Sequence, residues 1–134
     1  TIRQPDVSDA LISLLVWAAS LASLVGARLR KGSVPDSQNR MNTLLGKDKT
    51  DRPWVIEQAS NHALSVRTKN WKYIEPSSGV PFMYWGPKIE TGYLETPQLY
   101  NMEQAGEKEN LATQHPEKVF ELEQILREVR KENR

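Results

Sequence analysis

The stretch that decides the fold is Ala63-Leu-Ser-Val-Arg67-Thr-Lys-Asn-Trp71-Lys-Tyr-Ile74, near the middle of the chain. Leu64 and Val66 alternate with polar residues, and Trp71 and Tyr73 do the same after a short polar break. A period of two places apolar side chains on one face of a strand and polar side chains on the other. We therefore predict two antiparallel strands joined by a tight turn, with one face buried and one face in water.

Short runs on either side extend this sheet. Trp54-Val-Ile56 precedes the central stretch, and Gln98 to Met102 follows it after a long segment rich in proline and glycine. Both runs contain the β-branched or aromatic residues that are typical of strands. Within the intervening segment, residues 76–97, the run Phe82-Met-Tyr84-Trp85 predicts a further short strand, and the remainder is expected to be irregular.

The C-terminal segment has the pattern of an amphipathic helix. Pro116 stands in its first turn, where the missing N–H of proline is harmless. Apolar residues then recur at helical spacing, at Val119, Leu122, Leu126 and Val129, with Phe120 and Ile125 beside them. A helix with one apolar stripe packs that stripe against a neighbour. The predicted fold class is therefore α+β, with a small antiparallel β-sheet packed by a C-terminal helix.

A second helical pattern lies near the start of the chain. Residues 9–27 are the most apolar stretch, and residues 10–27 contain no charge. Apolar residues recur at helical spacing, at Leu11, Leu14, Leu15, Ala18, Leu21, Ala22 and Val25. We expect Asp6 or Ser8 to cap this helix and Gly26 to end it in the left-handed conformation.

The same predicted helix is apolar on its other side, at Ile12, Val16 and Ala19. Such a helix is buried in a large protein or lies in a membrane, and its length approaches the roughly 20 residues that span a bilayer. Its serines and alanines favour the buried helix. Since the chain has little else with which to cover it, and begins without Met or a signal pattern, the sequence reads as a fragment.

Composition narrows the function. With 134 residues the chain is one domain or a piece of one, and 38% hydrophobic and 26% charged residues are typical of a soluble globular protein. The net charge of +1 argues against nucleic-acid and acidic-membrane partners, although Lys69 and Lys72 interleave with aromatic residues. Without cysteine, the chain has no disulfide, thiol nucleophile or cysteine metal site.

Candidate catalytic groups are few. His62 and His115 are far apart, and His115 directly precedes Pro116, where a capping role is expected. His62 is expected to lie on the surface. The acidic residues lack metal-ligand spacing, and the glycines form no phosphate-binding loop. We therefore predict no catalytic residue and no metal ligand in this chain.

Two groups of residues resemble the C-terminal region of the sulfatase family, whose members hydrolyse sulfate esters. The first group consists of Ala63, Leu64, Arg67, Trp71, Lys72, Tyr73 and Ile74. The second consists of Leu99, Tyr100, Asn101, Glu107, Asn110, Leu111, Ala112, His115, Pro116 and Glu117. The resemblance extends over nearly the whole chain, from about Ser8 to Arg130.

The resemblance implies two parts, with the polar loop Lys47 to Pro53 as their boundary. Residues 1–53 resemble the terminal helix and exit loop of the large, alkaline-phosphatase-like α/β domain, and residues 54–134 resemble the C-terminal subdomain. In the family, a formylglycine and a divalent cation, here expected to be calcium, carry the chemistry upstream of this region. Ser33-Val-Pro35-Asp-Ser37 begins like the formylglycine motif Cys/Ser-x-Pro-x-Arg but lacks its arginine, so we expect a loop.

The resemblance also implies where substrate would lie. The small subdomain shapes one wall of the substrate cleft, and Gln58, Asn61 and His62 are the substrate-binding residues that we expect, with the excursion Val80 to Gly92 beside them. The implied substrate is a sulfated carbohydrate or, as in an arylsulfatase, an aryl sulfate. A periplasmic or secreted location is implied in the same way.

The leading hypothesis is a sulfatase segment that lacks the catalytic centre and has no sulfatase activity alone. Two alternatives stay open. One is a stand-alone interaction or glycan-binding module. The other is a small domain anchored in a membrane by Ala10 to Ala27, with Arg28, Arg30 and Lys31 on the cytoplasmic side.

Overall fold

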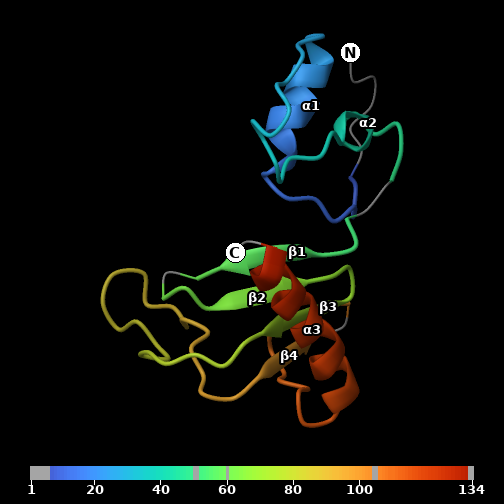
Figure 1. Ribbon diagram of the computed structural model, residues 1–134. Coiled ribbons are helices and arrows are strands. Elements are labelled where there is room, and N and C mark those ends of the chain that lie inside the picture. The colour runs from blue at the N-terminus through green and yellow to red at the C-terminus, as the bar shows by residue number, and fades with distance from the viewer. Residues whose placement is uncertain (1–6, 50–51, 60, 104–105, 133–134) are drawn as a thin grey trace. The chain divides into compact units, whose positions relative to one another are not determined.

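A computed structural model describes residues 7–49, 52–59, 61–103 and 106–132. The chain divides into two compact units, Thr1–Pro53 and Trp54–Arg134 (Figure 1). The first unit holds α1 (Val16–Leu24) and α2 (Met41–Leu44), and the second holds β1 (Val55–Gln58), β2 (Leu64–Arg67), β3 (Trp71–Ile74), β4 (Gln98–Asn101) and α3 (Pro116–Glu132). The assignment of the two units to two domains of a larger enzyme stays a prediction.

The second unit is built on an antiparallel sheet in the order β1-β2-β3-β4, which confirms the predicted strands. The register places one residue of each strand in a single row across the sheet: Ile56, Val66, Tyr73 and Leu99. Val66, Tyr73 and Leu99 are each at most 1% exposed, so this row is the sheet's half of the core. Burial raises the pKa of the Tyr73 phenol to about 12, with the charges of Glu123 and Glu75 adding to the shift.

α3 covers one face of the sheet and supplies the other half of the core (Figure 1). Leu122 and Leu126 are each 1% exposed and cluster with the buried row. Val119 and Ile125 pack against this cluster, as the apolar stripe predicted. Phe120 is 63% exposed, so its predicted place beside the stripe is wrong. With 3.6 residues per turn, position 120 falls on the side opposite to Leu122 and Leu126.

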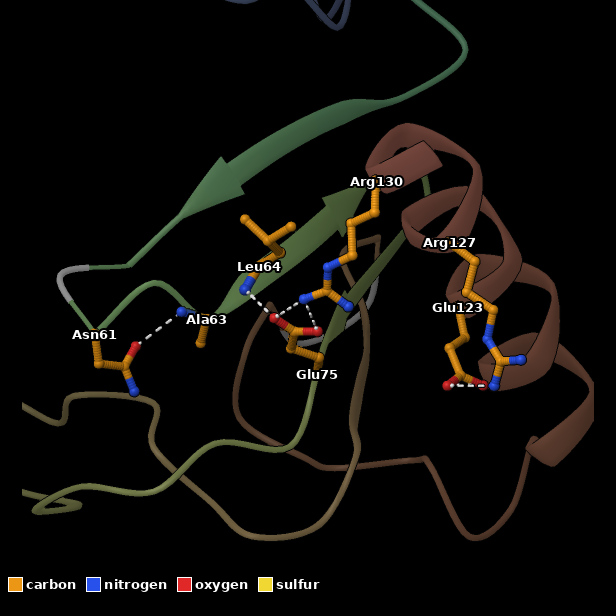
Figure 2. A network of polar contacts seen from close by, with 7 residues as sticks. All are labelled: Asn61, Ala63, Leu64, Glu75, Glu123, Arg127 and Arg130. Carbon is orange, nitrogen blue, oxygen red and sulfur yellow. Dashed lines mark hydrogen bonds and ion pairs between the residues drawn. The ribbon is translucent and has the colours of Figure 1, made fainter. Parts of the chain in front are cut away.

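A carboxylate joins α3 to the sheet near the start of β2 (Figure 2). Glu75 Oε1 accepts a hydrogen bond from the Leu64 N–H at 2.6 Å. Arg130 Nη2 donates to both carboxylate oxygens of Glu75, at 2.8 and 2.7 Å. The Glu75 side chain is only 15% exposed, whereas that of Arg130 is 51% exposed. Glu75 therefore connects a backbone group of the sheet with the last turns of the helix.

In the first unit, α1 is shorter than predicted, because it begins at Val16 and not near residue 9. The Ser37 hydroxyl accepts a hydrogen bond from the Ala19 N–H and donates to the Leu15 carbonyl, two groups that an uninterrupted helix would pair with each other. Ser8 accepts from the Ala10 N–H ahead of the helix, and Asp6 lies outside the described residues.

The predicted end of α1 is confirmed at Gly26, which has a φ of +69°. The N–H of Ala27 reaches back to the carbonyl of Ala22 at 2.8 Å, which is the six-to-one hydrogen bond of a Schellman ending. Only a residue without Cβ adopts this left-handed conformation freely.

The buried side of α1 is not the predicted apolar stripe. Val16 and Ser20 are fully buried, and the Ser20 hydroxyl accepts a hydrogen bond from the Arg40 N–H at 2.8 Å. Stripe residues Leu14 and Val25 are 83% and 75% exposed. The first unit is too small to cover more than one side of the helix. Of the helices in the described ranges, none combines the length and hydropathy needed to cross a membrane.

We expect Glu75→Ala to destabilise the chain more than Arg130→Ala. Removing Arg130 loses a half-exposed ion pair, which solvent screens, so the cost is roughly 0.5–1 kcal/mol. Removing Glu75 also leaves the Leu64 N–H without its acceptor, at a cost of roughly 1–3 kcal/mol more. Urea unfolding of the two variants measures the difference. Arg127→Ala, which breaks only the exposed pair with Glu123, is the matched control. Equal losses in all three variants would contradict this role of Glu75.

Candidate functional site

The segment between β3 and β4, residues 76–97, folds on itself beside the sheet. Backbone hydrogen bonds join Met83 N–H to the Ile89 carbonyl at 2.9 Å and Thr91 N–H to the Pro81 carbonyl at 3.0 Å. Phe82 and Glu90 form an isolated antiparallel bridge. The predicted strand Phe82–Trp85 is therefore reduced to a single bridged residue, since no neighbouring strand is present along the rest of it in the described residues. We call residues 76–97 the excursion.

Polar side chains attach the excursion to the sheet. The Gln98 side chain, in a residue 2% exposed, donates through Nε2 to the Gly92 carbonyl at 2.7 Å. Its Oε1 accepts from the Tyr100 hydroxyl at 2.7 Å. From the loop between β1 and β2, Asn61 Nδ2 donates to the Ser78 carbonyl at 3.2 Å. The excursion is thus held at both ends by amide side chains.

One glycine permits the closest approach within the excursion. A Cβ added to Gly79 would lie 2.2 Å from Cδ2 of Tyr93, well inside van der Waals contact. Gly79 also has a φ of +155°, which other residues rarely adopt. The missing side chain therefore lets the Tyr93 ring lie directly against the backbone.

Three hollows surround this ring. The first, of about 270 Å³, lies over the sheet and is lined by Glu57, Ser65, Lys72 and Glu107 among others. The second, of about 420 Å³, is mainly apolar and is lined by Val80, Met83, Trp85 and Ile89 with Ala59 and Thr91. The third, of about 410 Å³, is lined by Phe82, Gln98 and Tyr100 among others. Glu90 and Tyr93 line all three, so the hollows meet at these two residues.

The charges in the first hollow are paired. Lys72 Nζ lies 2.8 Å from Glu107 Oε1 and 3.2 Å from Glu57 Oε2, and its side chain is 16% exposed. Ser65 donates to Glu57 at 3.2 Å. Burial acts to lower the pKa of Lys72, but the hydrogen bond to Glu107 and the charge of Glu57 outweigh it and raise the pKa above its ordinary value. Lys72 therefore stays charged at neutral pH.

The hollows as a whole are acidic. Among the described residues that line them, Glu57, Glu90 and Glu107 are acidic and Lys72 is basic, which gives a formal charge of −2. Burial raises the pKa of the Tyr100 hydroxyl, and the charges of Glu107 and Glu90 raise it further. The electrostatic potential here favours neutral or cationic groups over anions.

The three residues predicted to bind substrate are placed differently from one another. Gln58 ends β1 and lines the first hollow. Asn61 uses both ends of its amide inside the fold, because its Oδ1 also accepts from the Ala63 N–H at 3.1 Å (Figure 2). His62 is exposed in the left-handed conformation, with φ +69°. Neither Asn61 nor His62 lines the hollows, and a contact of any of the three with substrate stays a prediction.

The structure brings together residues that the sequence analysis does not name as substrate-binding. All three, Glu90, Trp85 and Tyr93, lie within the excursion. Glu90 and Trp85 belong to residues 80–92, which are expected beside the substrate, and Tyr93 follows that range. The aromatic run Phe82-Met-Tyr84-Trp85 is the one pattern in the sequence that could have indicated this site, but it predicts a strand instead. Glu90 gives no signal of its own in the sequence, because it becomes special only where three hollows meet.

His115 does not join this site. Its ring packs edge-on against Trp71 at 5.4 Å, and its Nδ1 lies 3.3 Å from Glu117 Oε1. Its backbone carbonyl accepts from the N–H groups of Lys118 and Val119 in the first turn of α3. Within the part of the chain that the structure describes, no three His, Asp or Glu side chains are arranged to hold a metal ion.

Comparison with known proteins shows what the chain is similar to. No family model matches the chain. The chain is 43% identical over 128 residues to an N-acetylgalactosamine-6-O-sulfatase of Bacteroides thetaiotaomicron, a match that covers 95% of this chain and 25% of the relative. The chain is thus similar in sequence to a sulfatase. Its fold and sequence correspond to the C-terminal part of such an enzyme.

Solved structures agree with this relationship. A Bacteroides thetaiotaomicron protein labelled "6S-sulf", from work on glycosaminoglycan metabolism, matches with a TM-score of 0.83 and 44% identity over 91% of this chain and 25% of its own. A candidate sulfatase from the same species has a TM-score of 0.57 and 21% identity, which shows a shared fold alone. The chain thus spans about a quarter of the length of the sulfatases it matches.

We expect Gly79→Ala to displace the Tyr93 ring and to destabilise the second unit by roughly 1–3 kcal/mol, because the added methyl group collides with the ring. Gly86→Ala is the matched control, since Gly86 also has positive φ, +66°, but has nothing within 4 Å of an added Cβ. Urea unfolding and the NMR shifts of the Tyr93 ring measure both effects. Equal destabilisation with an unmoved Tyr93 in both variants would show that the close approach is unimportant.

Proposed function

We propose that this chain is the C-terminal segment of a sulfatase that hydrolyses a sulfate ester on a carbohydrate. The observation that carries the proposal is the 43% identity over 95% of the chain to a relative whose name gives N-acetylgalactosamine 6-O-sulfate as its substrate. Because that relative is named for a sulfated sugar, a sulfated glycan is favoured here over an aryl sulfate.

In this proposal, the chain shapes one wall of the substrate cleft and contributes no catalytic group. The three hollows around Tyr93 support a part in the cleft wall, because ligand sites are concave and combine apolar lining with a few polar groups. The formylglycine and the calcium ion would be supplied by residues outside this chain. The Ser33-Val-Pro35-Asp-Ser37 segment departs from the formylglycine motif, so no step of the reaction is assigned to it.

The first unit would be the last helix and exit loop of the larger α/β domain. Three large apolar side chains of the α1 region support this, because Leu14 is 83%, Leu24 57% and Trp17 44% exposed. Large apolar side chains exposed in such number on one short segment are normally covered by protein. In the proposed enzyme, the remainder of the α/β domain covers it. A periplasmic or secreted location is proposed from the family resemblance.

A stand-alone glycan-binding module is the second candidate. The observation that favours it is the second unit's own core, in which Val66, Tyr73 and Leu99 pack with Leu122 and Leu126 without help from residues 1–53. Both candidates predict contact with a glycan. They differ in whether a longer polypeptide carrying this chain performs catalysis.

The test compares the 134-residue chain with the polypeptide obtained by extending its reading frame upstream. We expect that extension to contain Cys/Ser-x-Pro-x-Arg and the longer protein to release sulfate from N-acetylgalactosamine 6-sulfate, while the chain alone releases none. Alanine at the first position of the motif is the control and is expected to abolish release. Sulfate release by the chain alone, or an inactive longer protein that still binds the sugar, would contradict the proposal.

A further inference from the structure

Glu90 contributes its carboxylate to all three hollows. It is exposed and lies where the three hollows meet, and its side chain makes no hydrogen bond or ion pair with the residues that the structure describes. The neighbouring acids differ, since Glu57 and Glu107 both pair with Lys72. Among the described acidic residues that line the hollows, Glu90 is therefore the one whose carboxylate has no ion pair with a described residue.

The charge of the hollows disfavours the sulfated end of a glycan. Sulfate and carboxylate groups are recognised by Arg, Lys or backbone N–H groups, whereas the lining residues carry a formal charge of −2. The single cation, Lys72, is already held between two carboxylates. An uncharged part of a glycan therefore suits these hollows better than a sulfated part.

The second hollow supplies an apolar surface on which an uncharged sugar ring can lie. Trp85 is 64% exposed, and Val80 and Ile89 stand beside it at 50% and 54%. A pyranose ring has one face of C–H groups and a rim of hydroxyls, so it suits an aromatic wall with a hydrogen-bond acceptor at its edge. Glu90, Thr91 and Tyr93 are the residues with polar side chains that line this hollow, and the Thr91 hydroxyl already donates to the Val80 carbonyl.

We propose that the hollow between Trp85 and Glu90 binds an uncharged pyranose ring of the glycan, with its C–H face on Trp85 and its hydroxyls donating to the Glu90 carboxylate. The inference rests on the proposed glycan substrate, because charge and shape alone define only an uncharged, hydroxyl-bearing ligand. It adds that the sulfated group lies elsewhere and that this hollow selects the part of the substrate without charge.

The test uses the isotope-labelled 134-residue chain and three sugars: N-acetylgalactosamine, N-acetylgalactosamine 6-sulfate and glucuronate. NMR shifts of the Trp85 indole N–H and the Thr91 amide are followed up to about 50 mM sugar, the range suited to millimolar affinity. We expect saturable shifts with N-acetylgalactosamine and at least about tenfold weaker binding of the two anions. Equal or tighter binding of the anions would overturn the inference. So would unmoved Trp85 and Thr91 signals, the result expected if another segment of a larger protein fills the hollow.

Two variants test separately the aromatic wall, Trp85, and the hydrogen-bond acceptor, Glu90. Trp85→Ala is expected to abolish the shifts at Thr91, whereas Tyr84→Ala, at a 73% exposed aromatic that lines none of these hollows, leaves them unchanged. Glu90→Gln is expected to weaken N-acetylgalactosamine binding. It is also expected to reduce the preference for N-acetylgalactosamine over the two anionic sugars to about threefold in affinity, because the charge that repels the anions is gone. Glu95→Gln, an exposed acid of the excursion outside the hollows, is its control.

If Glu90→Gln changes the affinity for N-acetylgalactosamine but leaves the ratio of its affinity to that of the anionic sugars unchanged, Glu90 has a merely structural role. That result would overturn its part in the inference. Binding by the chain and sulfate release by the longer polypeptide are separate readouts. Failure of the proposed function therefore leaves the binding result standing, and failure of the binding result leaves sulfate release untouched.

Discussion

Burial of one row of side chains across the sheet is the constraint on which the rest of the second unit depends. Val66, Tyr73 and Leu99 lie opposite one another in register and are covered by Leu122 and Leu126 of α3. Because side chains alternate along a strand, fixing this row also fixes what stands on the other face. That face carries the row Glu57, Ser65, Ile74 and Gln98, with Lys72 and Tyr100 beside it. The core therefore sets the floor of the hollows.

The same alternation explains how much the sequence predicted. Strands β2 and β3, the α3 stripe and the turn at Gly26 follow from short-range patterns, and all were predicted. The start of α1 was not, because the Ser37 hydroxyl enters the helix from 18 residues away in the chain. The hollows were also not predicted from the sequence. They arise from backbone contacts within the excursion and from the absence of a side chain at Gly79, which leave no periodic pattern to recognise.

The candidate site residues show the same limit. Gln58, Asn61 and His62 were selected by their place in a loop, yet the Asn61 amide is used to hold that loop to Ser78 and Ala63. A residue's type does not reveal whether its polar atoms are already paired inside the fold. Glu90 is the reverse case. Nothing in the sequence distinguishes it from the other glutamates, and only its position where three hollows meet makes it a candidate site residue.

The acidic hollows give a physical reason why, in the proposed enzyme, the sulfate and the uncharged part of the glycan would bind to different parts of the protein. A sulfate ester needs cationic groups around it, and the described residues that line the hollows offer a single lysine already paired with Glu57 and Glu107. Chemistry on the sulfate would then belong to the larger α/β domain. The excursion would hold the uncharged remainder of the glycan against Trp85.

The most direct measurement is the effect of Trp85→Ala on the longer polypeptide with two substrates, a sulfated oligosaccharide and a small aryl sulfate. If this chain contacts the glycan and contributes no catalytic group, kcat/KM for the oligosaccharide falls about tenfold or more, a loss of roughly 1.4 kcal/mol in transition-state binding, while turnover of the aryl sulfate is unchanged. An equal loss with both substrates would contradict the central claim.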